Sequence, residues 1–250
     1  MALQDEFELQ GNFLFKFRGI LPLIFIVLGI LVFSLDRYNG ISFDSTITFS
    51  KIEYASLIVC LFGLSIRIYT VGHTPANTSG RNTGCQIADK LNTTGIYSVV
   101  RHPLYLGNFF MWLGISLLTA NTWFVFSFIL IYWIYIERIM YVEELFLKRK
   151  FGDDFIHWAS NTPAFFISFE NWEKSCYPFS WKKVLKNEKN GLLAIFVLLF
   201  VFHSIYFSFE SKSIQAEMNW IFYVAVVTAV FYLILKYIKK KTGLLNEDGR

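Results

Sequence analysis

Six long apolar runs constrain this chain more than any other feature of its sequence. They cover roughly residues 19–35, 51–70, 104–120, 122–141, 191–209 and 219–238. A helix needs about 20 apolar residues to cross a hydrocarbon layer about 30 Å thick, and each run comes near that length. Hydrophobic residues make up 54% of the 250-residue chain, which is more than a soluble domain of this size uses. The sequence therefore predicts an all-α integral membrane protein with about six transmembrane helices.

These runs divide the chain into three segments. Residues 1–70 hold the first two predicted helices, residues 71–190 hold two loops and helices three and four, and residues 191–250 hold the last two helices and a basic tail. Only residues 119–122 separate the third and fourth runs, which predicts an antiparallel helical hairpin. The sequence has no glycine-rich phosphate-binding fingerprint, so we expect no Rossmann domain.

The distribution of positive charge predicts the orientation. If the N-terminus and the two long loops share one side of the membrane with the C-terminal tail, that side receives all of the 23 lysines and arginines except Arg37, Lys51 and Lys212. The positive-inside rule then places both termini and both loops in the cytoplasm. The net charge of +4 indicates basic clusters resting against anionic lipid head groups, not a nucleic-acid partner.

The three cysteines predict neither a disulfide framework nor a metal site. Cys60 lies inside an apolar run, and Cys85 and Cys176 lie in the two long loops. No pair has Cys-x-x-Cys spacing or a neighbouring pair of histidines, which are the patterns that disulfide and zinc sites use.

A polar segment runs directly into the third apolar run. Tyr97, Arg101, His102 and Tyr105 surround Pro103, which suits the first position of a helix because its missing N–H costs nothing there. His102 then falls at the N-cap, near the membrane boundary and among backbone donors without helical partners. Such a place can hold a polar ligand. The alternative is a basic interfacial anchor beside a membrane span.

The returning helix of the hairpin brings its own ionisable residues to the same depth. At about 1.5 Å per residue, the two legs place His102 and Glu143 level with each other. Glu137 and Arg138 lie deeper, where an ionisable group is costly without a partner or a hydrated cavity. A salt bridge of Arg138 that only fastens the hairpin is one explanation. The polar residues of the 84–94 loop converge on the same place, which favours a small-molecule site.

These residues resemble a known family. Residues 91–107 contain Gly-x-Tyr followed by His-Pro-x-Tyr, and the pair Glu143 and Glu144 and then Phe151-Gly152 follow at similar spacing. Over roughly residues 80–166 this pattern resembles the catalytic half of the isoprenylcysteine carboxyl methyltransferase and phospholipid methyltransferase superfamily. The extended pattern, from residues 79–83 to 107–110, is most similar to bacterial lipid A 1-phosphate methyltransferases.

The resemblance implies S-adenosylmethionine as methyl donor, bound at the cytoplasmic end of the hairpin. The faces of Tyr97 and Tyr105 suit its sulfonium cation, and Glu143 suits its amino group. His102 and the N–H groups of the helix start suit its carboxylate or adenine edge. The residues that we expect to bind it are Gln86, Lys90, Leu91, Asn92, Tyr97, Arg101, His102, Pro103, Leu104, Tyr105 and Glu143.

One departure from the family pattern concerns the acceptor. Members that methylate a prenylcysteine carry an arginine four residues before the donor-binding glutamate, but here Ile139 stands at that position and Arg138 precedes it. We predict catalytic roles for Arg138, as the residue that binds the acceptor anion, and for Glu144. Methyl transfer to an oxyanion depends mainly on positioning and on exclusion of water.

A site at the membrane surface favours an amphiphilic acceptor that enters from the bilayer. We predict O-methylation of a lipid-linked phosphate in a bacterial inner membrane, with prenylcysteine carboxyl methylation as the alternative. Two further alternatives stay open, a NADPH-dependent enone or sterol reductase and a non-catalytic membrane scaffold. The reductase would need more cationic partners for its pyrophosphate than Arg81, Lys90 and Arg101. A non-catalytic scaffold has no reason to keep ionisable groups at that depth. The aromatic faces of the last two runs suit either lipid or a homo-oligomer.

Overall fold

The computed structural model describes residues 2–41, 48–75, 86–211, 218–247 and 249. Within these ranges the chain folds into α-helices and one 3-10 helix, η1, and contains no β-strand, which confirms the all-α prediction. The helices are α1 (Leu3–Phe17), α2 (Leu21–Tyr38), α3 (Phe49–Gly72), η1 (Gly95–Ser98), α4 (Pro103–Leu117), α5 (Thr122–Phe151), α6 (Asp153–Asn161), α7 (Trp181–Ser211) and α8 (Trp220–Lys241).

Four described helices, α3, α5, α7 and α8, are long and apolar enough to cross a membrane. The pair α1 and α2 counts as a fifth if its two parts, bent by 73°, are taken as one span. Helix α4 is apolar but has only 15 residues, a rise of about 22 Å. The chain is therefore an integral membrane protein, and its described residues contain four or five candidate spans, where the sequence predicted six.

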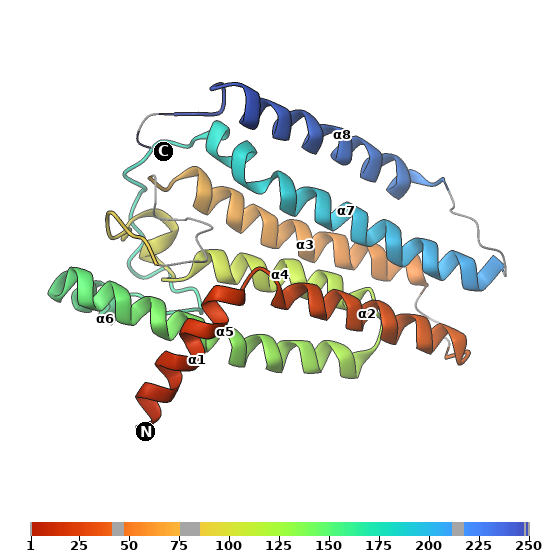
Figure 1. Ribbon diagram of the computed structural model, residues 1–250, viewed down its shortest axis with the longest axis horizontal. Coiled ribbons are helices and arrows are strands. Elements are labelled where there is room, and N and C mark those ends of the chain that lie inside the picture. Colours follow the sequence, from red (N-terminus) through yellow and green to blue (C-terminus); the bar gives the residue numbers. More distant parts are fainter. Residues whose placement is uncertain (1, 42–47, 76–85, 212–217, 248, 250) are drawn as a thin grey trace.

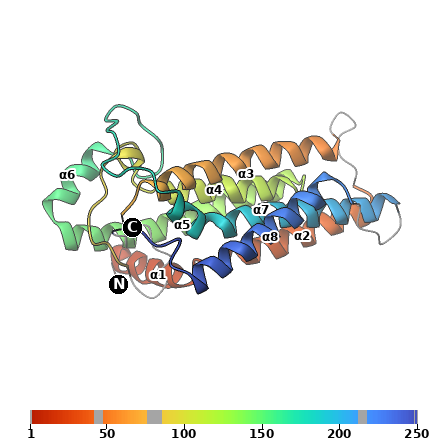
Figure 2. The ribbon, with the colours of Figure 1, turned by 90° about the horizontal axis from the view of Figure 1, so that it is seen from above.

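The long helices lie side by side along one direction (Figure 1). Helix α3 packs between α4 and α7, α8 packs on α7, and α1 leaves the bundle to pack on the last part of α5. Seen from above, η1, α6 and the segment before α7 gather at one end of the bundle (Figure 2). We call this end, with residues 86–102 and 152–180, the loop end. Helix α1 begins there and α8 ends there.

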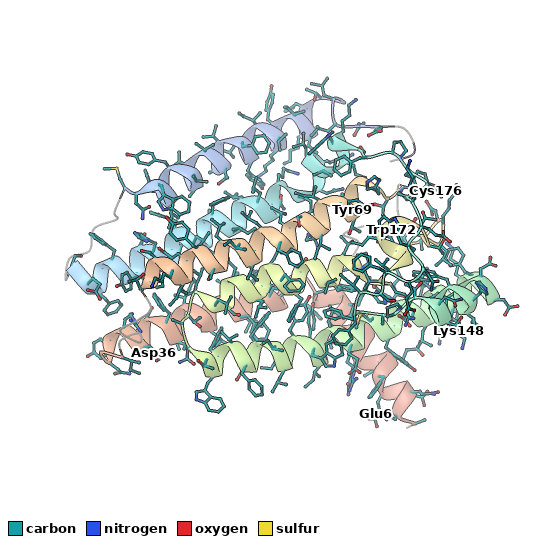
Figure 3. All side chains as sticks on the ribbon, turned by 180° about the vertical axis from the view of Figure 1, so that it is seen from behind. Glu6, Asp36, Tyr69, Lys148, Trp172 and Cys176 are labelled. Carbon is teal, nitrogen blue, oxygen red and sulfur yellow. The ribbon has the colours of Figure 1, made fainter. Side chains whose placement is uncertain are left out.

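The labelled residues distinguish the two ends of the bundle (Figure 3). Lys148, Trp172 and Cys176 lie at the loop end, and Asp36 lies at the opposite end. Helix α7 runs without a break across residue 190, where the sequence suggested a segment boundary. Arg81, Cys85 and Lys212, together with the 79–83 part of the family-like pattern, lie outside the described residues.

Small residues bring α3 and α4 into close contact. A Cβ atom added to Gly63 would lie 2.5 Å from the carbonyl oxygen of Gly107, and one added to Gly114 would lie 2.6 Å from that of Ser56. Close approach through glycine is a common way for membrane helices to associate. At Gly107 the added atom would also meet the side chain of Arg67 at 2.6 Å, so this contact fixes Arg67 against the beginning of α4.

Candidate functional site

A cavity of about 660 Å³ lies among α1, α2, α3, α4, α5 and α7 at the loop end. Its volume falls within the range of pockets that bind small molecules. All eleven residues that the sequence predicted to bind the methyl donor line it, from Gln86 in the loop to Glu143 on α5. The two residues predicted to be catalytic, Arg138 and Glu144, are not among the lining residues.

The start of α4 has the predicted N-cap, with His102 before Pro103. The N–H of His102, however, donates to the carbonyl oxygen of Ala164 at 3.2 Å, and that of Arg101 donates to Pro163 at 2.9 Å. The N–H of Tyr105 donates to the carbonyl of His102 at 3.1 Å. The chain that follows α6 therefore uses donors that the sequence suggested would be free, and fewer remain for a ligand.

Arg101 and Glu144 form a clamp that holds the loop end together. The Nε and Nη2 atoms of Arg101 donate to the Glu144 carboxylate at 2.8 and 3.2 Å. Its Nη1 atom donates to the carbonyl oxygens of Ala159 and Thr162 at 2.7 and 2.6 Å. The Nε2 atom of His102 lies 2.9 Å from Glu144 Oε1. Glu144 thus contacts His102 without lining the cavity itself, and the catalytic role predicted for it stays a prediction.

Glu143 presents its carboxylate to the cavity. Its Oε1 atom accepts hydrogen bonds from the Tyr105 hydroxyl at 2.7 Å and from Arg18 Nη1 at 3.2 Å. Its Oε2 atom lies 3.7 Å from His102 Nδ1, too far for a hydrogen bond. One oxygen of Glu143 is therefore fixed by the protein, and the other is the better placed to receive a cationic ligand.

Tyr97 lies on η1 and also lines the cavity. Burial raises the pKa of its hydroxyl, and the nearby Glu143 carboxylate raises it further. The side chain therefore stays neutral at physiological pH and offers an aromatic face. The indole N–H of Trp158 on α6 donates to the carbonyl oxygen of Tyr97 at 2.9 Å, which fixes η1 against α6.

Sequence reasoning did not single out a second polar group in the cavity. Arg67 on α3 donates from Nε and Nη2 to the carboxylate of Glu188 on α7, at 2.8 and 2.7 Å. Its Nη1 atom donates to Asn108 Oδ1 on α4 at 2.6 Å. All three residues line the cavity, and Glu188 is buried. The available signal was the position of Arg67 inside an apolar run, where a charge requires a partner.

Arg18, which also lines the cavity, was missed for a different reason. It follows α1 directly, and only the bend between α1 and α2 brings it to Glu143. In the sequence Arg18 looks like one of the basic residues that commonly flank a membrane span.

Arg138 lies on another face of α5. Its guanidinium carbon stands 3.5 Å from the ring centre of Phe7, and it donates to Gln10 and Glu137 at 3.4 and 3.1 Å. Five residues correspond to about 500° of helical rotation, so Arg138 and Glu143 point in directions about 140° apart. The Arg138 side chain therefore faces α1 and does not line the cavity, and the acceptor-binding role predicted for it stays a prediction.

Farther from the loop end, the cavity becomes apolar. Trp112 and Ile115 line it from α4, and Ile195 and Leu198 line it from α7. Trp112 and Ile115 lie about 14 to 18 Å along α4 from Pro103. We call this part of the cavity, with Leu23 of α2, the apolar arm.

Comparison with known proteins adds the following findings. Residues 53–154, which include most of α3 and the whole of η1, α4 and α5, match the family model described as Phospholipid methyltransferase. Protein-S-isoprenylcysteine O-methyltransferase B from Arabidopsis thaliana is 36% identical over 30% of this chain and 38% of its own length. Protein-S-isoprenylcysteine O-methyltransferase from Schizosaccharomyces pombe is 37% identical over 30% of this chain and 31% of its own length.

A third relative matches over a longer stretch. Cobalt-zinc-cadmium resistance protein CzcN from Cupriavidus metallidurans is 29% identical over 62% of this chain and 66% of its own length. No solved structure matches the chain. The chain thus spans about a third of the length of the two curated isoprenylcysteine relatives. The region that matches the family model includes the α4 and α5 residues of the cavity.

Proposed function

We propose, from the premise that residues 53–154 belong to the isoprenylcysteine carboxyl methyltransferase and phospholipid methyltransferase superfamily, that this protein is a membrane-embedded methyltransferase dependent on S-adenosylmethionine. One observation carries the proposal. The eleven residues that the family pattern assigns to the donor come from the loop, η1, α4 and α5, and all of them line one cavity.

The residues of the cavity fit this donor chemically. Glu143 would hold its ammonium group, and the faces of Tyr97 and Tyr105 would stand near its sulfonium, a cation–π contact of about 0.5–2 kcal/mol. Lys90 and the neighbouring loop would hold its carboxylate. When bound, the donor supplies an electrophilic methyl group. The family match and the cavity chemistry favour this donor over NADPH.

The shape of the cavity supports an amphiphilic acceptor. The apolar arm offers Trp112, Ile115 and Leu198 to a lipid tail. Arg18 and Arg67 line the same cavity nearer its polar part. We therefore propose a lipid-linked anion, either a carboxylate or a phosphate. The isoprenylcysteine names of the relatives support the carboxylate, whereas the comparisons offer no support for the lipid A phosphate suggested by the sequence pattern.

The transfer itself requires little proton chemistry from the protein. An acceptor oxygen forms a bond to the methyl carbon as the bond from that carbon to sulfur breaks, and a carboxylate or phosphate oxygen is nucleophilic without losing a proton. The protein then has to align the two reactants and exclude water. The clamp of Arg101 and Glu144 serves donor binding, because it fixes His102 and the start of α4.

We also propose that the loop end faces the cytoplasm, where the donor is available. Basic residues lie in the last turns of α5 and α8, and they suit contact with anionic lipid head groups. A bacterial inner membrane and a homo-oligomer remain predictions from the sequence.

Calorimetry on the detergent-purified full chain tests the proposal. We expect the wild type to bind S-adenosylmethionine and not NADPH, and we expect Glu143→Ala and His102→Ala to bind the donor more weakly. Transfer of labelled methyl from the donor to N-acetyl-S-farnesylcysteine, compared with extracted phospholipids, then separates a carboxylate acceptor from a phosphate acceptor. Binding of NADPH alone would indicate a reductase, and binding of neither would indicate a scaffold.

A further inference from the structure

We infer that Arg67, held in place by Glu188 and Asn108, binds the anionic head group of the acceptor, and that Glu188 restricts this head group to a single negative charge. The inference rests on the proposed function and assigns the acceptor site to residues of α3, α4 and α7. Helix α7 lies outside the region that matches the family, so the assignment concerns this chain's own residues.

The hydrogen bonds of Arg67 leave donors for a ligand. A guanidinium group has five N–H donors. Arg67 uses one on each oxygen of Glu188 and one on Asn108. Two N–H donors therefore have no acceptor among the described residues, although the side chain is only 14% exposed. Since Arg67 lines the cavity, the contents of the cavity can accept these bonds.

The other arginines near the cavity are less suited to this role. Arg101 spends four hydrogen bonds on Glu144 and on two backbone carbonyls, so it is committed to the protein. Arg138 faces α1, outside the cavity. Arg18 makes its ion pair with Glu143, which we assign to the donor. Among the described arginines that line the cavity, Arg67 is the one whose carboxylate partner contacts neither His102 nor the proposed donor site.

Arg67 also lies at the right place along the cavity. Its partner Asn108 is one and a half turns along α4 from Pro103, on the side of the apolar arm. Its partner Glu188 precedes Ile195 and Leu198, which line the arm from α7. A head group at Arg67 therefore has the donor residues on one side and space for its tail on the other.

Glu188 determines how much charge this site accepts. Its carboxylate balances the charge of Arg67, and the pair is shielded from water because Glu188 is only 4% exposed. Each additional negative charge on the acceptor is repelled by Glu188, and the repulsion is strong where the dielectric constant is low. A singly charged carboxylate or phosphodiester therefore fits better than a doubly charged phosphate monoester. Glu188 is a positioning residue, since it acts through Arg67.

Binding of three probes with the same tail tests the inference on the full chain in detergent. They are N-acetyl-S-farnesylcysteine, its methyl ester, and farnesyl monophosphate, measured at mildly alkaline pH where the monoester carries two charges. We expect the wild type to bind the acid roughly tenfold to a hundredfold more tightly than the ester, because hydrogen bonds to charged groups are strong. Arg67→Gln should abolish this preference, and Arg67→Lys should reduce it.

Matched variants separate the proposed role from a folding defect. Arg149→Gln removes an exposed arginine that pairs with Glu8, and it should retain the preference for the acid. Glu188→Gln should improve binding of farnesyl monophosphate relative to the acid by at least about threefold, whereas a purely structural role would weaken all three probes alike. If Arg67→Gln also loses donor binding, the test relies on Arg67→Lys instead. A reduced preference for the acid in that variant, with donor binding retained, supports the proposed role of Arg67.

The outcomes are distinct from those for the proposed function. Failure of the wild type to bind S-adenosylmethionine counts against the methyltransferase assignment. Donor binding by the wild type together with equal affinity for acid and ester, or with no binding of either probe, overturns the role of Arg67. An unchanged preference in both Arg67 variants overturns it as well. An unchanged ratio of monophosphate to acid in Glu188→Gln overturns the charge restriction.

Discussion

Two pairs of a carboxylate and a histidine, each with one buried member, lie at opposite ends of this bundle. At the loop end, His102 Nε2 lies 2.9 Å from Glu144 Oε1. At the other end, His203 Nδ1 on α7 lies 2.7 Å from Glu53 Oε1 on α3, and its Nε2 lies 2.6 Å from Asn219 Nδ2. Ionisable side chains are costly to place inside a membrane protein, so each pair is by itself a candidate functional site.

The two pairs differ in whether the cavity lies beside them. His102 lines the cavity next to Glu143, whereas His203, Glu53 and Asn219 are not among its lining residues. Asn219 also caps α8, since its Oδ1 atom accepts the N–H of Phe222 at 3.2 Å. The pair at the far end therefore joins α3, α7 and the start of α8. A histidine paired with a carboxylate inside the bundle indicates a functional site only where a cavity gives a ligand access to the pair.

The largest effect on stability is expected from His203→Phe. The buried carboxyl group of Glu53 would lose its histidine partner, which should lower the free energy of unfolding by about 3 kcal/mol. Thermal unfolding in detergent measures this change, and calorimetry should find donor affinity within about twofold of the wild type. The double variant with Glu53→Leu should recover much of the loss. A large fall in donor affinity would show that the two ends are coupled.

The largest effect on binding is expected from Glu143→Gln. Loss of the charged partner of the donor's ammonium group should weaken S-adenosylmethionine binding by about 2 kcal/mol, roughly thirtyfold. The matched control is Glu137→Gln, since Glu137 lies on the same helix, is half exposed, and pairs with Arg138 outside the cavity. Equal donor affinity in the two variants would refute the assignment of Glu143.

Glu144→Gln should have a smaller effect of a different kind. It weakens the clamp with Arg101 and the orientation of His102, so donor affinity should fall by about 1 kcal/mol, roughly fivefold. Single-turnover methyl transfer at saturating donor should change little. A fall in that rate of more than a hundredfold, with donor affinity retained, would restore a catalytic role to Glu144.

The smallest effect is expected from Arg138→Gln. Its contacts with Phe7 and Gln10 lie at the protein surface, where such pairs contribute less than about 1 kcal/mol. Affinities for donor and for N-acetyl-S-farnesylcysteine should stay within about twofold of the wild type. Loss of acceptor affinity here, with none in Arg67→Gln, would reverse the assignment made from the structure.

The sequence by itself determined the membrane class and the polar end of the cavity. Apolar length predicts membrane helices because the bilayer sets the number of residues required. Tyr97, His102 and Tyr105 surround Pro103, and α5 returns after a short turn, so their meeting with Glu143 follows from local chain geometry. These are short-range rules, and they place neighbours correctly.

Only the tertiary structure decided which arginine enters the cavity and how many helices qualify as spans. Arg138 turns away because α1 packs on that face of α5, and Arg18 turns in because α1 and α2 are bent. Arg67 meets Glu188, a residue 121 positions later, where glycines let α3 and α4 approach closely. Hydrophobic length specifies that helices form, but it carries no information on which faces pack together, and that packing selects the partners of each charge.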